Sequence, residues 1–313
     1  MRFLVMRFWA EIRPVNAQQR FLAWCGSLLL ASGVVHTVVA VVDGGSWWGP
    51  VSWRKPVDFA LSFGLLLWSV VWILRQLRRA RWAWLPVGLL GGSAVFEVAL
   101  ITMQRWRGVP SHFNHATPFD DAVFGGMGMS VVAVVVAVAV LLVWSLLAVR
   151  GQPGSRIAAV AGLVGVLAAG VIGKDMIDAG EAVVTATGQV PSELVFGAAG
   201  SAKLAHALGL HGLQVLILLT IGLALGPRPA ALRRNLMALG AVGYGALFAS
   251  VTATAYAGRA WVEPTLEMAV LGAAGLAAVV TAAVATVGPL LSTIRSSASP
   301  VAGSGQSAEV MVR

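Results

Sequence analysis

The chain has 313 residues, of which 58% are hydrophobic and only 11% are charged. A soluble globular domain carries about 25% charged residues, so this composition excludes an ordinary soluble domain and predicts a multi-pass protein of the cell membrane. The formal net charge of +9 is divided among short basic segments, and no soluble domain carries a basic face, which argues against nucleic-acid binding. The partner that the composition predicts is the lipid bilayer.

Long apolar segments follow one another along the chain. A helix needs about 20 residues to cross the ~30 Å of hydrocarbon in a bilayer. We therefore expect an all-α, polytopic bundle of about eight transmembrane helices that forms one domain over residues 21–292. A cytoplasmic segment over 1–20 precedes it, and a disordered cytoplasmic tail over 293–313, rich in Ser, Gly and Ala, follows it. The predicted spans cover residues 21–42, 57–74, 83–103, 122–149, 157–176, 202–225, 235–257 and 264–291.

Basic segments alternate with these spans. Cytoplasmic loops are enriched in Lys and Arg, and most of the 22 Lys and Arg precede the first span, follow the last, or join spans two and three, four and five, and six and seven. Both termini are therefore predicted to be cytoplasmic. On the opposite side we expect all 5 histidines and every acidic residue except Glu11 and Glu309.

Polar side chains recur near the non-cytoplasmic ends of the first three spans. Ser32 and His36 share a face of the first span, Lys55 and Asp58 open the second, and Glu97 lies inside the third. A carboxyl group within a span must be neutral, paired or metal-bound. Glu97 is therefore a candidate catalytic residue, Lys55 and Asp58 are candidate supporting groups, and His36 is a candidate cofactor ligand. Purely structural, hydrogen-bonded roles for Glu97 and His36 remain open.

The connection between the third and fourth spans has the composition of a functional loop, because it mixes charged, polar and aromatic side chains with Gly and Pro. His112 is a candidate metal ligand, and Asp120 is a candidate catalytic general base. The supporting polar residues predicted here are Gln104, Arg107 and Asn114.

The sixth span carries the sharpest local pattern, with Lys203, His206, His211 and Gln214. At about 100° per residue these side chains fall on one stripe roughly 140° wide, which should face the bundle interior. The two histidines are about 7.5 Å apart along the axis, so we expect different roles for them. His211 is the candidate cofactor or metal ligand. His206 is the candidate proton relay or catalytic group, with metal ligation as an alternative.

These polar positions are also expected to meet. Polar side chains on two helices can complete their hydrogen bonds when the polar stripes of the two helices face each other. We therefore predict one cavity, open to the non-cytoplasmic side, that His112 and Asn114 cover from the loop. The side chains predicted to converge in it are Glu97, Gln104, His206, His211 and Gln214.

The motifs over roughly residues 50–220 resemble, as a set, those of a widespread group of uncharacterised bacterial multi-span membrane proteins. His115 lies outside the pattern, and Asp121 replaces an expected Gly. The resemblance implies which residues matter and implies no reaction. Its motifs are Trp53-Arg54-Lys55-Pro56, then Glu97 with Gln104, Arg107-Gly108 and Ser111-His112-Phe113-Asn114, then Pro118-Phe119-Asp120, and finally Ala205-His206 through Leu208-Gly209-Leu210-His211 to Leu213-Gln214.

Three functions remain open from the sequence, and whether the chain is an enzyme is left undecided. The first is a haem b or transition-metal redox protein, because histidines on separate helices suit such ligation; the single cysteine, Cys25, excludes a Cys-based site. The second is a proton-coupled transporter of a small solute. The third is a metal-dependent hydrolase or transferase for a lipid or small-molecule substrate on the non-cytoplasmic side. We rank the redox protein first, because the polar groups stop in one half of the bundle.

Overall fold

The computed structural model describes residues 2–298. Within them the chain forms nine α-helices, one short 3-10 helix and no strand. Eight helices are long and apolar enough to span a membrane, so the predicted all-α bundle of eight spans is confirmed. The helices are α1 (Arg2–Ile12), α2 (Ala17–Asp43), α3 (Arg54–Gln76), α4 (Trp84–Trp106, preceded by the 3-10 turn η1, Arg81–Ala83), α5 (Pro118–Ala148), α6 (Ser155–Thr187), α7 (Ala202–Leu225), α8 (Ala230–Tyr256) and α9 (Leu266–Ala298).

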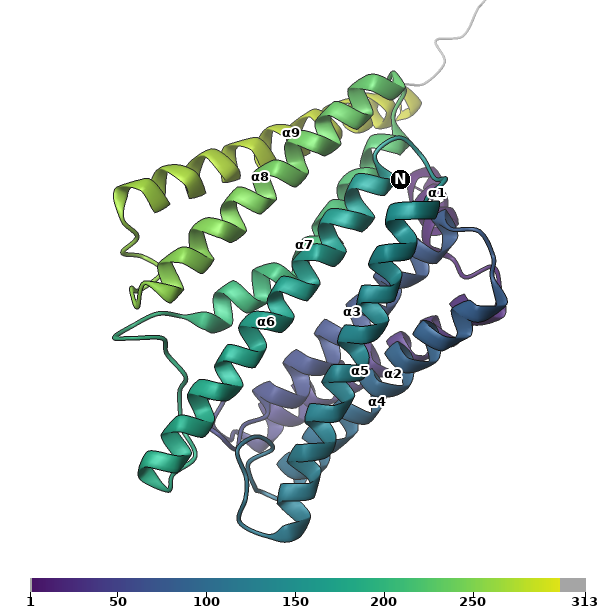
Figure 1. Ribbon diagram of the computed structural model, residues 1–313. Helices are drawn as coiled ribbons and strands as arrows, with labels where there is room; N and C mark the ends of the chain where they lie inside the picture. The colour runs from purple at the N-terminus through teal and green to yellow at the C-terminus, as the bar shows by residue number, and fades with distance from the viewer. Residues whose placement is uncertain (1, 299–313) are drawn as a thin grey trace, which may run out of the picture.

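The bundle has two chemically different ends. The arginine end carries residues 77–83, 149–154 and 226–229, and the histidine end carries residues 44–53, 107–117, 188–201 and 257–265. The N-terminal helix α1 and the last turns of α9 both lie at the arginine end (Figure 1). The positive-inside rule predicts that this end is cytoplasmic.

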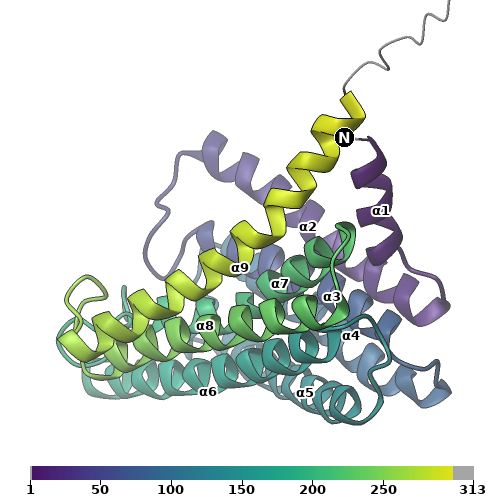
Figure 2. The same cartoon turned by 90° about the horizontal axis from the view of Figure 1, so that it is seen from above.

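The spanning helices divide into two groups of four. One group contains α2 to α5 and the other α6 to α9, and the contacts of α3 with α7 and of α5 with α6 join them. In Figure 1, α9 and α2 lie toward opposite edges of the bundle with α7 and α3 between them. Seen from above, α5 and α6 lie along the face opposite to α9 (Figure 2). Large apolar side chains such as Val41, Val42 and Leu147 are exposed on the outward faces, as a surface in contact with lipid requires.

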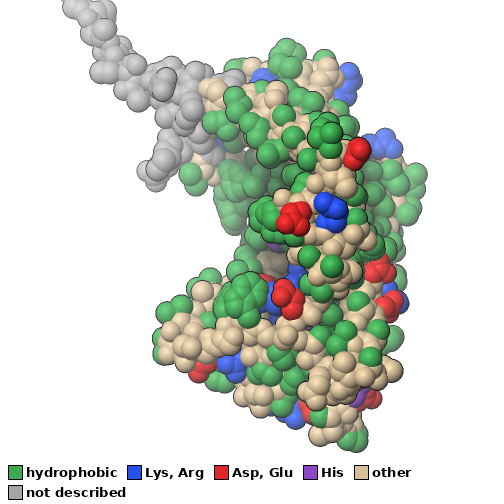
Figure 3. Space-filling view, turned by 90° about the vertical axis from the view of Figure 1, so that its left-hand side faces the viewer, with side chains coloured by type: hydrophobic (Ala, Val, Ile, Leu, Met, Phe, Trp, Pro, Cys, Tyr) green, Lys and Arg blue, Asp and Glu red, His purple; other side chains and the backbone are tan. Residues whose placement is uncertain are grey.

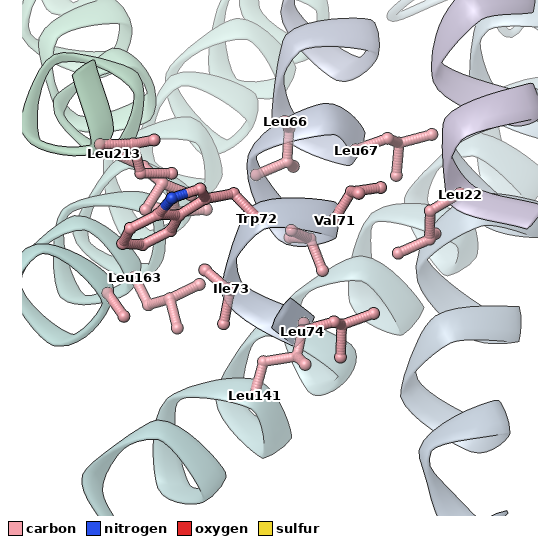
Figure 4. Packing of buried hydrophobic residues seen from close by; sticks show 14 of the residues in the cluster. Leu22, Leu66, Leu67, Val71, Trp72, Ile73, Leu74, Leu141, Leu163 and Leu213 are labelled. Carbon is pink, nitrogen blue, oxygen red and sulfur yellow. The ribbon is translucent and has the colours of Figure 1, made fainter. Parts of the chain in front are cut away.

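The core is built around α3. Its side chains Leu67 and Trp72 are no more than 1% exposed, and a helix that is apolar on all sides belongs in the interior. Trp72 points toward Leu163 and Leu213, while Leu67 lies on the side of Leu22 (Figure 4). The arginine-end half of α3 is thereby held between α2, α6 and α7.

Small residues bring α6 and α7 together. A Cβ atom added to Gly162 would come 2.7 Å from the Cα of Leu213, and one added to Gly209 would come 2.9 Å from the carbonyl oxygen of Gly165. Both distances are too short for a side chain, so glycine is required for this approach of two backbones, as is common between membrane helices.

Helix boundaries differ from the predicted spans at three places. The segment over 1–20 contains the separate helix α1, whose Phe8 and Ile12 pack against the core and whose C-terminal carbonyls accept hydrogen bonds from Arg75. Helix α6 continues past the predicted span to Thr187, and α9 continues to Ala298, beyond the predicted start of the tail. The remainder of that tail, 299–313, lies outside the described residues.

Candidate functional site

Positive charges gather at the histidine end where α3 and α7 begin. Arg54 Nη1 lies 3.7 Å from Asp58 Oδ2, and Lys203 Nζ lies 4.0 Å from Glu193 Oε1. Lys55 differs from both, because no carboxylate among the described residues lies within 4.0 Å of its ammonium group. The positive end of the α3 dipole lies at the same place. A half-buried ammonium without a counter-ion is unfavourable, so the charge of Lys55 is left uncompensated by the described residues.

Three buried donors close to Lys55 lack an acceptor among the described residues. They are Ser52 Oγ, Arg54 Nε and Arg105 Nε. Ser52, Lys55 and Arg105 line the same narrow pocket, which is too small for a water molecule, and Arg105 Nη2 donates to Asp43 Oδ2 at 3.1 Å. Nearly all buried polar groups in proteins are paired, so this corner holds more donors than the acceptors around it satisfy.

The loop between α4 and α5 covers the bundle beside this corner. The ring of His112 lies 5.7 Å from that of Phe59 and 6.0 Å from that of Phe124, and Ser111 Oγ is 2.9 Å from His112 Nδ1. Burial, together with the nearby charge of Lys55, lowers the pKa of His112 to about 3. His112 is therefore neutral at physiological pH and carries no part of the positive charge.

Phe113 anchors that loop. Its φ of 60° lies in the left-handed region, which a bulky residue adopts only when its surroundings hold it there. The ring packs on α6 where Gly180 leaves room, since a Cβ atom on Gly180 would come 2.3 Å from Phe113 Cζ. The loop is thus fixed against α6 by one aromatic side chain and one glycine.

Asp120 ties the loop to α4 and α5. Its Oδ1 accepts from Gln104 Nε2 at 3.0 Å and from Arg107 Nη1 at 2.5 Å, and its Oδ2 accepts from Thr117 Oγ1 at 2.7 Å. Asn114 braces the same loop by donating to the carbonyl oxygen of Pro110 at 3.0 Å. With both oxygens already accepting hydrogen bonds, Asp120 suits a structural clamp better than the predicted general base.

A second clamp, which the sequence analysis missed, involves His115. Its Nδ1 lies 2.6 Å from Asp121 Oδ1, and its Nε2 lies 3.2 Å from Glu181 Oε1. The hydrogen bonds to Asp121 and Glu181 raise the pKa of His115. The only signal in the sequence was that a basic residue and two acidic ones occur on the same side of the membrane, and pattern alone could not pair a loop with α6.

His36 has both ring nitrogens occupied. Nδ1 lies 2.8 Å from the carbonyl oxygen of Ser32, and Nε2 accepts from Trp106 Nε1 at 3.2 Å. Since Nδ1 faces a carbonyl and Nε2 faces an N–H donor, the tautomer with the proton on Nδ1 satisfies both contacts. The ring also stacks on Trp53 at 5.8 Å. This is the geometry of a structural histidine.

The polar stripe of α7 contacts two neighbouring helices. His206 Nδ1 lies 2.7 Å from the carbonyl oxygen of Ala169 on α6. The Gln214 amide, with its nitrogen turned toward the carbonyl oxygens of Leu210 and His211, faces Ser69 Oγ on α3 at 3.2 Å. His211 has no hydrogen bond to any described residue.

Glu97 lies elsewhere, buried between α4 and α5. Ser130 Oγ donates a hydrogen bond to Glu97 Oε2 and also lies 2.8 Å from the carbonyl oxygen of Met127. A hydroxyl group has one hydrogen, so a protonated Glu97 that donates to Ser130, while Ser130 donates to Met127, satisfies all three groups. That arrangement avoids a buried charge.

Four of the five side chains predicted to share one cavity have separate partners instead. Glu97 bonds to α5, Gln104 to Asp120, His206 to α6 and Gln214 to α3. In the part of the chain that the structure describes, no three His, Cys, Asp or Glu side chains lie close enough together to hold a metal ion. The predicted metal ligands His112, His206 and His211 are therefore not brought together.

One broad hollow does open on the histidine-end side of the molecule. In the space-filling view basic, acidic and histidine side chains lie in and beside it, with hydrophobic side chains around them (Figure 3). Exposed apolar side chains also lie further along α3 and α7, Leu65 at 41% and Leu218 at 55%.

No protein-family model, no curated protein and no solved structure matches this chain.

Proposed function

We propose that this integral membrane protein binds an anionic amphiphile, a molecule with a phosphate or carboxylate head and an apolar body, between α3 and α7 at the histidine end. The observation that carries the proposal is Lys55, an ammonium group held at the start of a membrane span without a carboxylate within 4.0 Å among the described residues. We place the protein in the cell membrane with this end on the non-cytoplasmic side.

The chemistry around Lys55 supports an anionic head group. Arg54 and Lys203 add two positive charges, each with a carboxylate only at 3.7 Å or 4.0 Å. Ser52 Oγ and the Nε atoms of Arg54 and Arg105 are donors without acceptors. Phosphate and carboxylate oxygens accept several hydrogen bonds at once and carry the compensating charge. A neutral ligand would leave Lys55 uncompensated.

The position of the site supports an amphiphile rather than a small soluble anion. Lys55 and Lys203 lie in the first turns of α3 and α7, the level at which lipid head groups lie in a bilayer. Leu65 and Leu218, further along the same two helices, are exposed and apolar, and a hollow opens at the surface of the molecule (Figure 3). A head group at Lys55 would therefore place an apolar tail against an apolar wall.

The haem interpretation finds no support in the geometry of its two proposed ligands. Axial ligation needs a free nitrogen on each imidazole, whereas both nitrogens of His36 are engaged, by Ser32 and by Trp106. A transition-metal site lacks the cluster of donors that it needs within the described residues. We therefore assign no reaction step to either group.

The remaining two interpretations rank below binding. A hydrolase would need a free general base, and both oxygens of Asp120 accept hydrogen bonds while Glu97 is buried against Ser130. A transport pathway would need polar groups through the whole bundle, and the contact of Gln214 with Ser69 is followed on α7 by an apolar half. Binding of a ligand from the histidine end requires only the groups described above, whether or not the ligand is later released to a partner.

Binding to the purified protein in nanodiscs tests the proposal. We would measure, by native mass spectrometry, retention of a long-chain fatty acid and of the alcohol of the same chain length by wild type, Lys55→Gln and Lys174→Gln. Lys174 is a matched control because it is exposed on α6 and already paired with Asp178 at 2.5 Å. A hydrogen bond to a charged group contributes about 1.5–3 kcal/mol, so Lys55→Gln should weaken fatty-acid binding roughly tenfold or more.

Comparison with Lys174→Gln shows whether a loss of fatty-acid binding is specific to Lys55. Preference for the acid over the alcohol in wild type and in Lys174→Gln, with loss of that preference in Lys55→Gln, supports the proposal. Equal retention of acid and alcohol by wild type, or an unchanged preference in Lys55→Gln, overturns it.

A further inference from the structure

The arginine end contains a second concentration of unpaired positive charge. Every ion pair between described residues is formed by residues outside this end. The loops over 77–83 and 149–154 contain no acidic residue, and Glu11, the described carboxylate on α1, accepts a hydrogen bond from Gln152 Nε2 at 3.0 Å. Arg78 and Arg150 therefore have no carboxylate within ion-pair distance among the described residues.

Several of these guanidinium groups surround one pocket. It lies between the end of α3 and the loop that joins α5 to α6, and encloses about 150 Å³. A single water needs roughly 10–15 Å³ by the same kind of measure, so the pocket has room for a group several atoms across. Its lining consists of Arg75, Gln76, Leu77, Arg78, Arg150 and Gly151.

The three arginines that line the pocket make different contacts. Arg75 donates to the carbonyl oxygens of Arg13 at 2.8 Å and Ala10 at 2.7 Å, and so closes the C-terminal end of α1. The side chains of Arg78 and Arg150 are exposed and make no hydrogen bond or ion pair with any described residue. Arg150 is held in place by its backbone, whose N–H donates to the carbonyl oxygen of Gln76 at 2.9 Å. Two free guanidinium groups thus flank a pocket whose third arginine is fixed.

The start of α6 adds two further donors on the same side. Ser155 is fully buried, and its Oγ has no hydrogen-bond partner among the described residues. It lies beside the pocket, because a Cβ atom on the lining residue Gly151 would come 3.0 Å from that oxygen. The N–H of Ser155 donates to the carbonyl oxygen of Gln152 at 3.0 Å. The N-cap residue Gly154 offers no side-chain cap, so the positive end of the α6 dipole, with the N–H groups that follow Ser155, lies on this side.

We propose that this pocket at the arginine end binds a phosphate group, supplied by the head group of an anionic phospholipid or by a soluble phosphate. Guanidinium groups match phosphate oxygens in charge and in geometry, an uncapped helix start is a ready site for an anion, and basic pockets at the cytoplasmic ends of spans bind lipid head groups. The site is separate from the one between α3 and α7 and does not depend on it.

The test compares two double variants with a single control, all in a Lys55→Gln background, so that the histidine end does not contribute. Arg78→Gln with Arg150→Gln removes both free charges, and Arg78→Lys with Arg150→Lys retains them. Arg79→Gln is the control, because Arg79 is exposed beside Arg78 and does not line the pocket. Retention of phosphatidylglycerol relative to phosphatidylcholine is read by native mass spectrometry after reconstitution, and binding of inorganic phosphate in zwitterionic nanodiscs is read by calorimetry.

A basic side chain near an anionic surface is worth about 1 kcal/mol, or roughly fivefold. The Gln double variant should therefore lose anion binding by about 25-fold, while the Lys double variant and Arg79→Gln stay within a few-fold of the background. Loss of phosphatidylglycerol preference identifies a lipid head group as the source, and loss of inorganic phosphate binding identifies a soluble one. The proposal is overturned if the background protein binds neither ligand, or if the Gln double variant, still folded by its thermal transition, binds as the background does.

Discussion

His36 Nε2 accepts a hydrogen bond from Trp106 Nε1 at 3.2 Å, and this contact joins α2 to α4 at the histidine end. The same ring stacks on Trp53 at 5.8 Å, and the Trp53 and Trp106 rings lie 5.0 Å apart. A histidine so enclosed orders the surface on which Arg105 and Asp43 form their ion pair. The contact therefore holds the residues around the proposed anion site in place.

Trp106→Phe should keep the aromatic packing and lose only the hydrogen bond to His36. We expect the free energy of unfolding in detergent to fall by about 1 kcal/mol, the usual net value of one such bond. Trp47→Phe is the control, because Trp47 lies in the neighbouring loop without a partner among the described residues. Equal effects of the two substitutions would contradict the contact.

Ser130→Ala and Glu97→Gln separate the two possible states of the buried carboxyl group. Ser130→Ala leaves Glu97 without its partner and should cost about 1–3 kcal/mol. Glu97→Gln imitates the neutral acid and can still donate to Ser130, so its cost should be well below that of Glu97→Ala. Thermal unfolding of the three variants measures this. If Glu97→Gln costs as much as Glu97→Ala, Glu97 is ionised and the arrangement inferred here is wrong.

Gly180→Ala tests the anchor of the loop between α4 and α5. The new methyl group would meet the ring of Phe113, so this overpacking should destabilise by about 1–3 kcal/mol and increase hydrogen exchange over residues 107–117. Gly125→Ala is matched to it, because a Cβ atom there meets nothing within 4 Å. Alanine is favoured over glycine in a helix, so that control should be neutral or stabilising. Similar losses in both variants would contradict the role of Phe113.

The clamp of His115 on Asp121 and Glu181 should loosen as the pH rises. Its pKa is raised in the folded protein, so its contribution is fully present below the unfolded value of about 6.5 and is lost as the pH passes through the higher folded value. Exchange of the amides over residues 107–117 should increase, beyond the chemical effect of pH, as the pH rises above about 6.5. The excess should vanish in His115→Gln; an excess that persists in that variant would assign it to another group.

Much of the fold could be predicted from the sequence, because the bilayer imposes both the length and the apolarity of a span. The sixth predicted span, 202–225, coincides with α7 (Ala202–Leu225). Helix α6 runs on to Thr187 because Lys174, Asp178 and Glu181 continue the helix outside the apolar region that hydropathy detects. Helix α1 was not predicted, because it is too short and too charged for hydropathy to detect it as a membrane span.

The site was less predictable, for a geometric reason. Helical periodicity tells which side of its own helix a residue occupies, and it placed Lys203 and Gln214 of α7 correctly on one stripe. It does not tell which helix lies opposite. Glu97 was therefore expected in one cavity with residues of α7, whereas its hydrogen bond is to Ser130 of α5. The resemblance to uncharacterised membrane proteins stays a prediction. It includes Lys55 among many other residues. Lys55 became the central residue of the proposed site only because the structure shows no carboxylate partner for it among the described residues.

The most direct test of the central claim is an experimental structure of the protein in nanodiscs that contain an anionic amphiphile. The account predicts density for an anionic head group with an oxygen within about 4 Å of Lys55 Nζ, the range of an ion pair, and an apolar chain that follows the faces of α3 and α7. A well-ordered structure in which Lys55 contacts only protein and water, with the amphiphile bound elsewhere or nowhere, would contradict it.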